Sequence, residues 1–162
     1  MCKVPPRYQI QRLLGEGGMG RVYLAEDRET GRRVALKFLR PIAGVSTELL
    51  REEVRLLRRL SHPQLVRVWD YHEEGASLCS SSEAEGPISG PCFSMEYVEG
   101  SPLDRACEGQ TPEVLRDYLL QAAKGLQYLH ALRLLHRDLK PANLLVTNSG
   151  KLKLVDFGLA GL

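Results

Sequence analysis

The sequence lacks the marks of a zinc-binding, secreted, membrane or strongly nucleic-acid-binding protein. Its four cysteines form no C-x-x-C pair and no Cys/His cluster with zinc-like spacing. No uncharged apolar run approaches the roughly 20 residues of a membrane span, and the N-terminus has no signal-peptide stretch. The 22 basic and 20 acidic residues leave a net charge of +2, so no strong field attracts nucleic acid or anionic lipid. We expect a cytoplasmic protein with reduced thiols, no membrane segment and no nucleic-acid partner.

What is present is typical of a globular protein. The 162 residues are 43% hydrophobic and 26% charged, which excludes a disordered or collagen-like chain. A chain of this length can bury a real hydrophobic core.

The first part of the chain is predicted to form a small sheet with one helix. Helical periodicity over residues 47–60 places a set of apolar side chains on one face. This set consists of Leu49, Leu50, Val54, Leu57 and Leu60. Alternating apolar residues predict strands at 8–13, 21–25, 33–39, 65–71 and 92–98.

Two segments interrupt this pattern. Residues 73–90 are rich in Ser, Glu and Gly and show no periodicity, so we expect an exposed loop insertion. Residues 99–102, Glu-Gly-Ser-Pro, are the best candidate for a boundary between two lobes. We predict a first lobe at 1–98 and a second at 99–162.

The second part is predicted to hold a long helix and a hairpin. Thr111 is an N-cap hydroxyl, and Pro112 and Glu113 suit the first helical turn. The apolar residues that follow at helical spacing are Leu115, Tyr118, Leu119, Ala122, Leu126 and Leu129. Two short strands, 143–146 and 151–155, flank a turn at 147–150. The whole order of elements predicts an α+β fold.

The segment from Gly15 to Gly20 reads G-x-G-x-x-G. A dinucleotide-binding fingerprint would open a helix, whereas here a Val-Tyr-Leu-Ala strand follows. Strand, glycine turn and strand predict a hairpin whose bare backbone can lie against phosphates. A plain structural turn is the alternative.

Lys37 lies inside an apolar strand, on the same face as Ala35. Buried lysines are rare unless they are paired. A phosphate-binding lysine with a carboxylate partner is one interpretation, and a lysine reaching solvent from an edge strand is the other. The following helix offers Glu52 and Glu53, of which Glu53 lies one turn before Leu57 and is the better partner.

The segment His136–Asn143 reads H-R-D-L-K-P-A-N, and residues 156–158 read D-F-G. Asn143 precedes the first strand of the predicted hairpin and Asp156 follows the second, so antiparallel pairing brings them together. An amide oxygen and a carboxylate are hard ligands that suit Mg²⁺. Asp138 can lie nearby as a base without binding metal.

Together these motifs resemble the eukaryotic-type protein kinase family in its serine/threonine branch. The glycine-rich loop, V-A-L-K, H-R-D-L-K-P-A-N and D-F-G occur in the family's order over nearly the whole chain. The sequence of residues 15–23, G-E-G-G-M-G-R-V-Y, is similar to the glycine-rich loop of bacterial serine/threonine kinases. The implied fold has an N-lobe with an antiparallel sheet and one helix, followed by an incomplete, helical C-lobe.

The resemblance also implies residue roles. ATP-binding residues would be Leu14, Gly15, Gly17, Gly20, Val22, Ala35, Lys37, Met95, Glu96, Val98 and Leu145. Lys37, paired with Glu53, would hold the α- and β-phosphates, and Lys140 would steady the γ-phosphate. Asp138 would accept the proton of the substrate hydroxyl. Asn143 and Asp156 would bind Mg²⁺.

The implied function is ATP- and Mg²⁺-dependent phosphoryl transfer to a Ser/Thr hydroxyl of a protein. The chain stops soon after D-F-G, before the segment and helices with which such kinases continue. We therefore expect exposed apolar surface and self-association through the C-lobe. This leaves a catalytically incompetent ATP-binding or interaction module as an alternative, with a dinucleotide-binding oxidoreductase a distant third.

Overall fold

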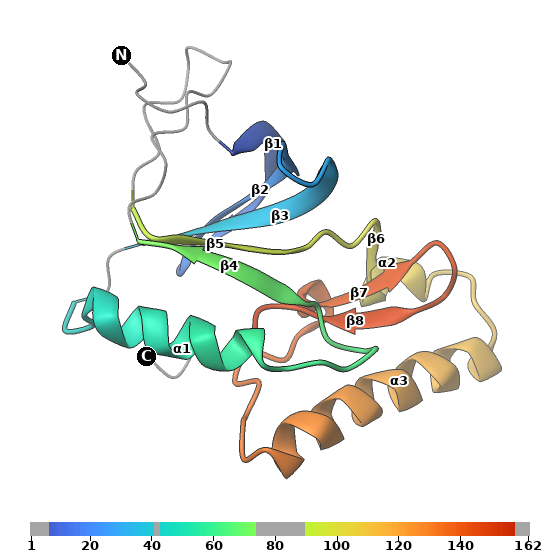
Figure 1. Cartoon of the computed structure of the whole chain (residues 1–162). Helices are drawn as coiled ribbons and strands as arrows, with labels where there is room; N and C mark the ends of the chain where they lie inside the picture. The colour runs from blue at the N-terminus through green and yellow to red at the C-terminus, as the bar shows by residue number, and fades with distance from the viewer. Residues whose placement is uncertain (1–6, 41–42, 74–89, 158–162) are drawn as a thin grey trace. The chain divides into compact units, whose positions relative to one another are not determined.

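The computed structural model describes residues 7–40, 43–73 and 90–157 (Figure 1). Most of the loop expected at 73–90 and the last residue of D-F-G therefore lie outside the described residues. The chain divides into two units. The first comprises the described parts of Met1–Arg58 and Val68–Tyr97, and the second comprises Arg59–Arg67 and the described part of Val98–Leu162.

The first unit is built on a five-stranded antiparallel sheet of order β1-β2-β3-β5-β4. Its strands are β1 (Tyr8–Gly17), β2 (Gly20–Asp27), β3 (Arg32–Leu39), β4 (Val68–His72) and β5 (Cys92–Glu96). The strands predicted from alternation are confirmed, with shifted ends. One face of the sheet carries a buried cluster of Tyr8, Tyr23, Ala25, Val34, Leu36, Phe38 and Cys92.

Helix α1 (Thr47–Arg58) is the predicted helix of the first unit. Leu50, Val54 and Leu57 are buried as expected, but Leu49 is 45% exposed. The expectation for Leu49 is wrong because its neighbour Leu50, one helical step of about 100° away, occupies the centre of the buried stripe.

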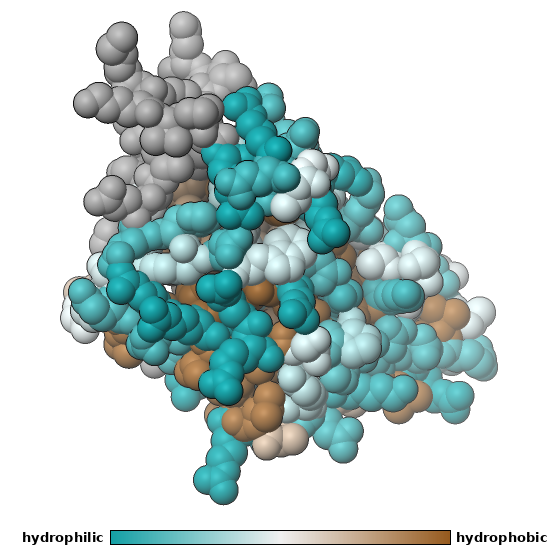
Figure 2. All heavy atoms as spheres, in the orientation of Figure 1, coloured by the Kyte–Doolittle hydropathy of each residue, from teal (hydrophilic) through white to brown (hydrophobic). Residues whose placement is uncertain are grey.

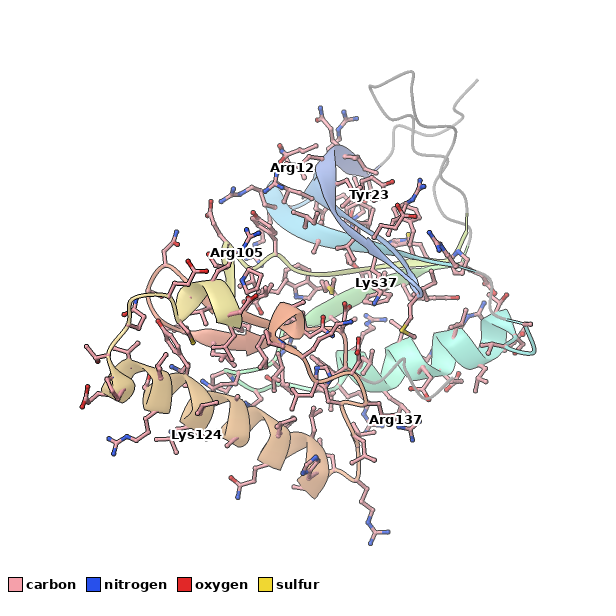
Figure 3. The ribbon with its side chains drawn as sticks, turned by 180° about the vertical axis from the view of Figure 1, so that it is seen from behind. Arg12, Tyr23, Lys37, Arg105, Lys124 and Arg137 are labelled. Atoms are coloured by element: carbon pink, nitrogen blue, oxygen red, sulfur yellow. The ribbon has the colours of Figure 1, made fainter. Side chains whose placement is uncertain are left out.

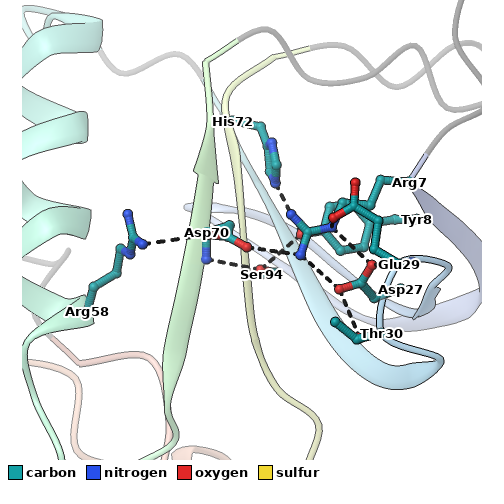
Figure 4. Close-up of polar contacts among 9 residues, drawn as sticks. All are labelled: Arg7, Tyr8, Asp27, Glu29, Thr30, Arg58, Asp70, His72 and Ser94. Atoms are coloured by element: carbon teal, nitrogen blue, oxygen red, sulfur yellow. Dashed lines mark hydrogen bonds and ion pairs between the residues drawn. The ribbon is translucent and has the colours of Figure 1, made fainter.

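A charged network joins the start of β1 to β2 and β4 (Figure 4). The Arg7 guanidinium donates to both carboxylate oxygens of Asp27, at 3.0 and 2.9 Å. It also forms ion pairs with Glu29 and Asp70, both at 3.1 Å. The Arg7 hydrogen bond is the largest cause of a lowered Asp27 pKa. This network is part of the first unit alone.

Helix α3 (Pro112–Ala131) starts as the sequence predicts, since the Thr111 hydroxyl accepts the backbone N–H of Val114. The buried side of the helix consists of Tyr118, Ala122, Gly125 and Leu129. Gly125 allows a close approach to strand β8 (Leu152–Leu154), because an added Cβ would lie 2.3 Å from Leu154 Cδ1. Leu119, expected on the buried stripe, is 62% exposed, because it follows Tyr118 by one helical step, away from the centre of that side.

The second unit also holds a three-stranded antiparallel sheet of order β6-β7-β8. Strand β7 (Leu144–Thr147) and β8 form the predicted hairpin, and a short helix α2 (Leu103–Ala106) follows strand β6 (Gly100–Pro102). The segment expected as a lobe boundary thus supplies a strand. Gly100 permits this, because a Cβ there would lie only 2.1 Å from the Val146 carbonyl oxygen of β7.

Several large apolar side chains of the second unit are exposed. They are Leu119, Leu120, Leu132, Leu135 and Leu139. Figure 2 shows one face of the protein, on which hydrophobic areas lie among predominantly hydrophilic side chains. Self-association through such a surface stays a prediction. None of the helices in the described part of the chain is long and apolar enough to cross a membrane.

Candidate active site

The glycine motif forms a hairpin turn between two strands. β1 and β2 pair antiparallel to the very end of the motif, where Gly17 lies opposite Gly20. The predicted strand–turn–strand is therefore confirmed, and the helix that a dinucleotide fingerprint requires is replaced by β2.

The glycines of this turn differ in their surroundings. A Cβ added at Gly15 or Gly17 would meet no atom within 4 Å. At Gly20, where φ is +143°, a Cβ would lie 1.8 Å from the Phe38 carbonyl oxygen of β3. Gly20 is thus required by the fold, whereas Gly15 and Gly17 leave open space beside their backbone.

The predicted nucleotide-binding side chains of the strands share one face of the sheet. Val22 lies directly opposite Lys37, and Ala35 lies directly opposite Met95. Because side chains alternate along a strand, these four point away from the Tyr23 cluster on the other face. Leu14 of β1 and Glu96 at the end of β5 are half-buried. The first unit therefore brings four of the predicted ATP-binding positions, Val22, Ala35, Lys37 and Met95, onto one face of the sheet.

Lys37 is 4% exposed and lies in β3, which has strands on both sides (Figure 3). The alternative of a lysine on an edge strand is therefore wrong. Of its two predicted partners, Glu52 is exposed and pairs with Arg55 at 2.6 Å. Glu53 is half-buried and takes part in none of the ion pairs found among the described residues. The pairing of Lys37 with Glu53 stays a prediction.

Three predicted catalytic-loop residues meet in the second unit. The Asn143 side-chain amide donates to the Asp138 carboxylate at 3.0 Å and to the Asp138 carbonyl at 2.8 Å. Lys140 Nζ lies 3.1 Å from the same carboxylate oxygen, Oδ2. The Lys140 hydrogen bond is the largest cause of a lowered Asp138 pKa. Asp138 is therefore a carboxylate at neutral pH, as a proton acceptor must be.

His136 holds this loop against the hairpin. Its Nδ1 accepts the backbone N–H of Asp138 at 3.3 Å, so Nε2 carries the proton and donates to the Val155 carbonyl at 2.9 Å. The imidazole is buried, and burial is the main cause of its lowered pKa, which keeps this tautomer neutral. Its ring also lies 6.2 Å from the Phe157 ring, centroid to centroid.

Asp156 follows directly after the end of the hairpin. The backbone N–H of Val155 donates to the Asn143 carbonyl at 3.0 Å, which extends the β7–β8 pairing to those residues. Asp156 itself has a φ of +57°, in the left-handed region that Asp tolerates better than most residues. Arg137, beside Asp138, has a φ of +65°. Left-handed backbone thus occurs at one predicted metal ligand, Asp156, and directly before the predicted base, Asp138.

The donor set fits a divalent cation of the magnesium kind. The buried Asn143 uses its amide nitrogen on Asp138, which leaves Oδ1 as a neutral oxygen ligand. Asp156 adds a carboxylate, and Mg²⁺ completes its coordination with phosphate oxygens and water. No group of three or more His, Cys, Asp or Glu suited to a metal occurs among the described residues, so a site made only by such side chains is not found there.

One contributor to this arrangement was missed by the sequence reasoning. Gln121 of α3 accepts the backbone N–H of Leu152 at 2.8 Å and donates to the Gly150 carbonyl at 3.0 Å. The side chain therefore fastens the hairpin that carries Asn143 and Asp156 to the long helix. Its position inside the helical pattern gave no signal, since a glutamine there is normally a solvated residue.

The predicted site residues thus fall into two groups. Those of the glycine turn and the sheet belong to the first unit, together with Glu53. The second group belongs to the other unit and consists of Val98, Asp138, Lys140, Asn143, Leu145 and Asp156. Leu145 lies in β7, and Val98 is buried.

Known proteins match nearly the whole chain. The family described as "Protein kinase domain" matches residues 8–162. The chain is 39% identical over 160 residues to serine/threonine-protein kinase PknA of Mycobacterium tuberculosis, which covers 95% of this chain and 35% of that protein. It is 38% identical to serine/threonine-protein kinase drp72 of Corynebacterium efficiens, over 97% of this chain and 30% of that protein.

A plant protein shows the same relationship. CBL-interacting protein kinase 12 of Oryza sativa is 35% identical over 95% of this chain and 27% of its own length. The chain therefore spans about a third of the length of the curated relatives it matches. With the family match over residues 8–162, the chain belongs to the protein kinase family, and its relatives include bacterial serine/threonine kinases.

Proposed function

We propose that this chain carries the ATP-binding and catalytic residues of a serine/threonine protein kinase. The observation that carries the proposal is the cluster of Asp138, Lys140 and Asn143, with Asp156 following the hairpin beside it. Protein kinases generally use ATP and a divalent metal, and the family's substrates are proteins. A Ser/Thr hydroxyl as acceptor, Mg²⁺ as the metal and a cytoplasmic location are the finer parts of this proposal.

The first unit is proposed to supply most of the nucleotide contacts, and Val98 and Leu145 of the second unit the others. Gly15 and Gly17 present bare backbone with open space beside it, so phosphates can approach closely. The Lys37 ammonium lies on the same sheet face as Val22 and Ala35, the positions proposed to contact adenine. A lysine there neutralises phosphate charge, and the small Ala35 leaves room for the flat base.

The second unit is proposed to orient and deprotonate the substrate hydroxyl. Asp138 accepts the hydroxyl proton, while Lys140 on the same carboxylate side steadies the negative charge of the transferred group. Asn143 and Asp156 would hold the metal, which when bound neutralises phosphate charge. The hydrogen bond from Asn143 fixes Asp138 before substrate arrives, which reduces the reorganisation that the reaction requires.

The test is phosphoryl transfer from radiolabelled ATP to a protein substrate by the full-length protein. We expect Mg²⁺-dependent labelling on Ser or Thr, and its loss in Lys37→Met and in Asp156→Asn. Lys124→Met is a matched control, because Lys124 is exposed on α3 (Figure 3). Asn tolerates the positive φ of Asp156, so that variant removes charge while preserving the backbone. Phosphoryl transfer at the wild-type level in either site variant would contradict the proposed mechanism.

A further inference from the structure

Three charged side chains meet beside the glycine turn of the first unit. Arg21 Nε of β2 lies 3.1 Å from Glu16 Oε1, and Arg40, which directly follows β3, pairs with the same oxygen. We call these three residues the Glu16 cluster. The hydrogen bond from Arg21 is the largest cause of a lowered Glu16 pKa, so Glu16 is charged at neutral pH. One carboxylate of the turn is thus shared by two guanidinium groups from other parts of the sheet.

The Glu16 cluster lies on the face of the sheet that points away from the proposed nucleotide. Glu16 is directly opposite Arg21 in the β1–β2 pairing, and Arg21 is directly opposite Phe38 in the β2–β3 pairing. Directly opposite residues of antiparallel strands project to the same face, and Phe38 belongs to the buried cluster of the sheet. Val22 and Lys37 project to the other face. The Glu16 cluster therefore acts on the turn without lining the proposed nucleotide surface.

Arg40 is tied to the turn at two points. Its backbone N–H donates to the Met19 carbonyl at 3.1 Å, while its side chain pairs with Glu16. Glu16 precedes the pair of Gly17 and Gly20 that closes the turn, and Met19 lies between those two glycines. One residue at the end of β3 therefore holds both the strand that enters the turn and the turn itself.

The glycine turn needs such ties because its own residues give it little to hold. A Cβ added at Gly15, Gly17 or Gly18 would meet no atom within 4 Å. Glycine backbone is also freer than that of other residues, so a single geometry is costly in entropy. Ion pairs on the outer face restrict this freedom and leave the space beside the glycines open. A turn that is fixed before the ligand arrives loses less entropy when it binds.

We propose that Glu16, Arg21 and Arg40 are positioning residues that hold the glycine turn in the geometry that binds the phosphates of ATP. This inference rests on the proposed function, because it concerns the same nucleotide site. All three side chains are at least 38% exposed, and exposed ion pairs contribute little to global stability. Loss of the cluster should therefore weaken nucleotide binding and leave the stability of the fold unchanged.

The experiment measures binding of MgATP to the full-length protein by isothermal titration calorimetry. The variant is Glu16→Gln, which keeps the shape of the side chain and removes its charge. We expect the dissociation constant to rise about three- to fivefold, with the thermal midpoint unchanged. In transfer assays the KM for ATP should rise with it while kcat stays the same. Arg32→Gln is the matched control, because Arg32 is exposed at the opposite end of β3 from Arg40.

The direction of the change separates positioning from a simple charge effect. ATP is an anion, so removal of a nearby negative charge would by itself tighten binding. A positioning role predicts the opposite, together with faster backbone amide exchange in a peptide covering residues 15–20 of nucleotide-free Glu16→Gln. A peptide covering β3 should exchange as in the wild-type protein.

Two outcomes would overturn the inference at different levels. Equal or tighter MgATP binding by Glu16→Gln would contradict the positioning role and leave the proposed function intact. Absence of MgATP binding by the wild-type protein would contradict the proposed function and the positioning role with it.

Discussion

The two groups of candidate site residues are built in different ways. In the first unit all of them except Glu53, which is in α1, lie on antiparallel strands, and Gly15 and Gly17 contribute by having no side chain. In the second unit the polar members lie outside the strands, with positive φ at Asp156 and at Arg137 beside Asp138, and the Asn143 side chain donates to the Asp138 carboxylate.

The difference predicts different consequences of mutation. An open position on a strand can be changed without disturbing the fold, so a loss there reports on the ligand. A buried polar residue such as Asn143 is both a proposed ligand and a hydrogen-bonding partner, so its loss affects structure and chemistry together.

The largest effect on stability is expected at the end of the glycine turn. Gly20→Ala should lower the free energy of unfolding by about 2–5 kcal/mol, because the new Cβ overlaps the Phe38 carbonyl and φ is +143°. Gly17→Ala should leave it nearly unchanged but raise the KM for ATP at least about tenfold. Urea unfolding and steady-state kinetics measure both quantities. Equal destabilisation by the two variants would remove the distinction between the glycines.

A smaller effect is expected where α3 holds the hairpin. Gln121→Ala should lower the free energy of unfolding by about 1–3 kcal/mol, because it leaves the Leu152 N–H and the Gly150 carbonyl without their partner. Gln127→Ala is the control, since Gln127 is exposed on the same helix. If the second unit depends on such bonds, Gln121→Ala should also raise the Mg²⁺ concentration needed for half-maximal transfer. Identical unfolding curves for the two variants would contradict the role of Gln121.

The smallest effect concerns the charged network of the first unit. Because Arg7 lowers the pKa of Asp27 in the folded protein, this pair contributes stability above the ordinary carboxyl pKa, and that contribution is lost as pH falls through the lowered value. On acidification below about pH 5, the free energy of unfolding should therefore fall by about 1 kcal/mol less in Asp27→Asn than in the wild-type protein. Denaturant unfolding from pH 7 to pH 3 measures it, with Asp104→Asn, an exposed position in α2, as control. An unchanged pH dependence in Asp27→Asn would show that Arg7 does not stabilise the carboxylate.

The sequence predicted the regular elements well because their periodicity is a direct consequence of burial. Alternation placed Ala35 and Lys37 on one sheet face, and the N-cap at Thr111 gave the start of α3. The predicted hairpin also implied that its two ends, at Asn143 and near Asp156, lie together, and the hydrogen bond from the Val155 N–H to the Asn143 carbonyl joins these ends.

Contacts between residues distant in sequence could not be predicted in the same way. The Gln121 bonds to the hairpin and the His136 bond to Val155 depend on how helix and strands pack, which no local pattern records. Strand β6, within the predicted boundary segment 99–102, was not predicted, because Gly100 and Pro102 are typical of turns. Its pairing with β7 depends on a close backbone approach that only the folded structure reveals.

The most direct test of the account is to measure nucleotide binding and phosphoryl transfer separately in Asp138→Asn. The proposal that the first unit binds the nucleotide while Asp138 acts on the substrate hydroxyl predicts an MgATP dissociation constant within about threefold of wild type. It also predicts a kcat lowered about 10²–10⁴-fold, the usual range for loss of a general base. A kcat unchanged within threefold would contradict the role of Asp138, and with it the central claim of this account.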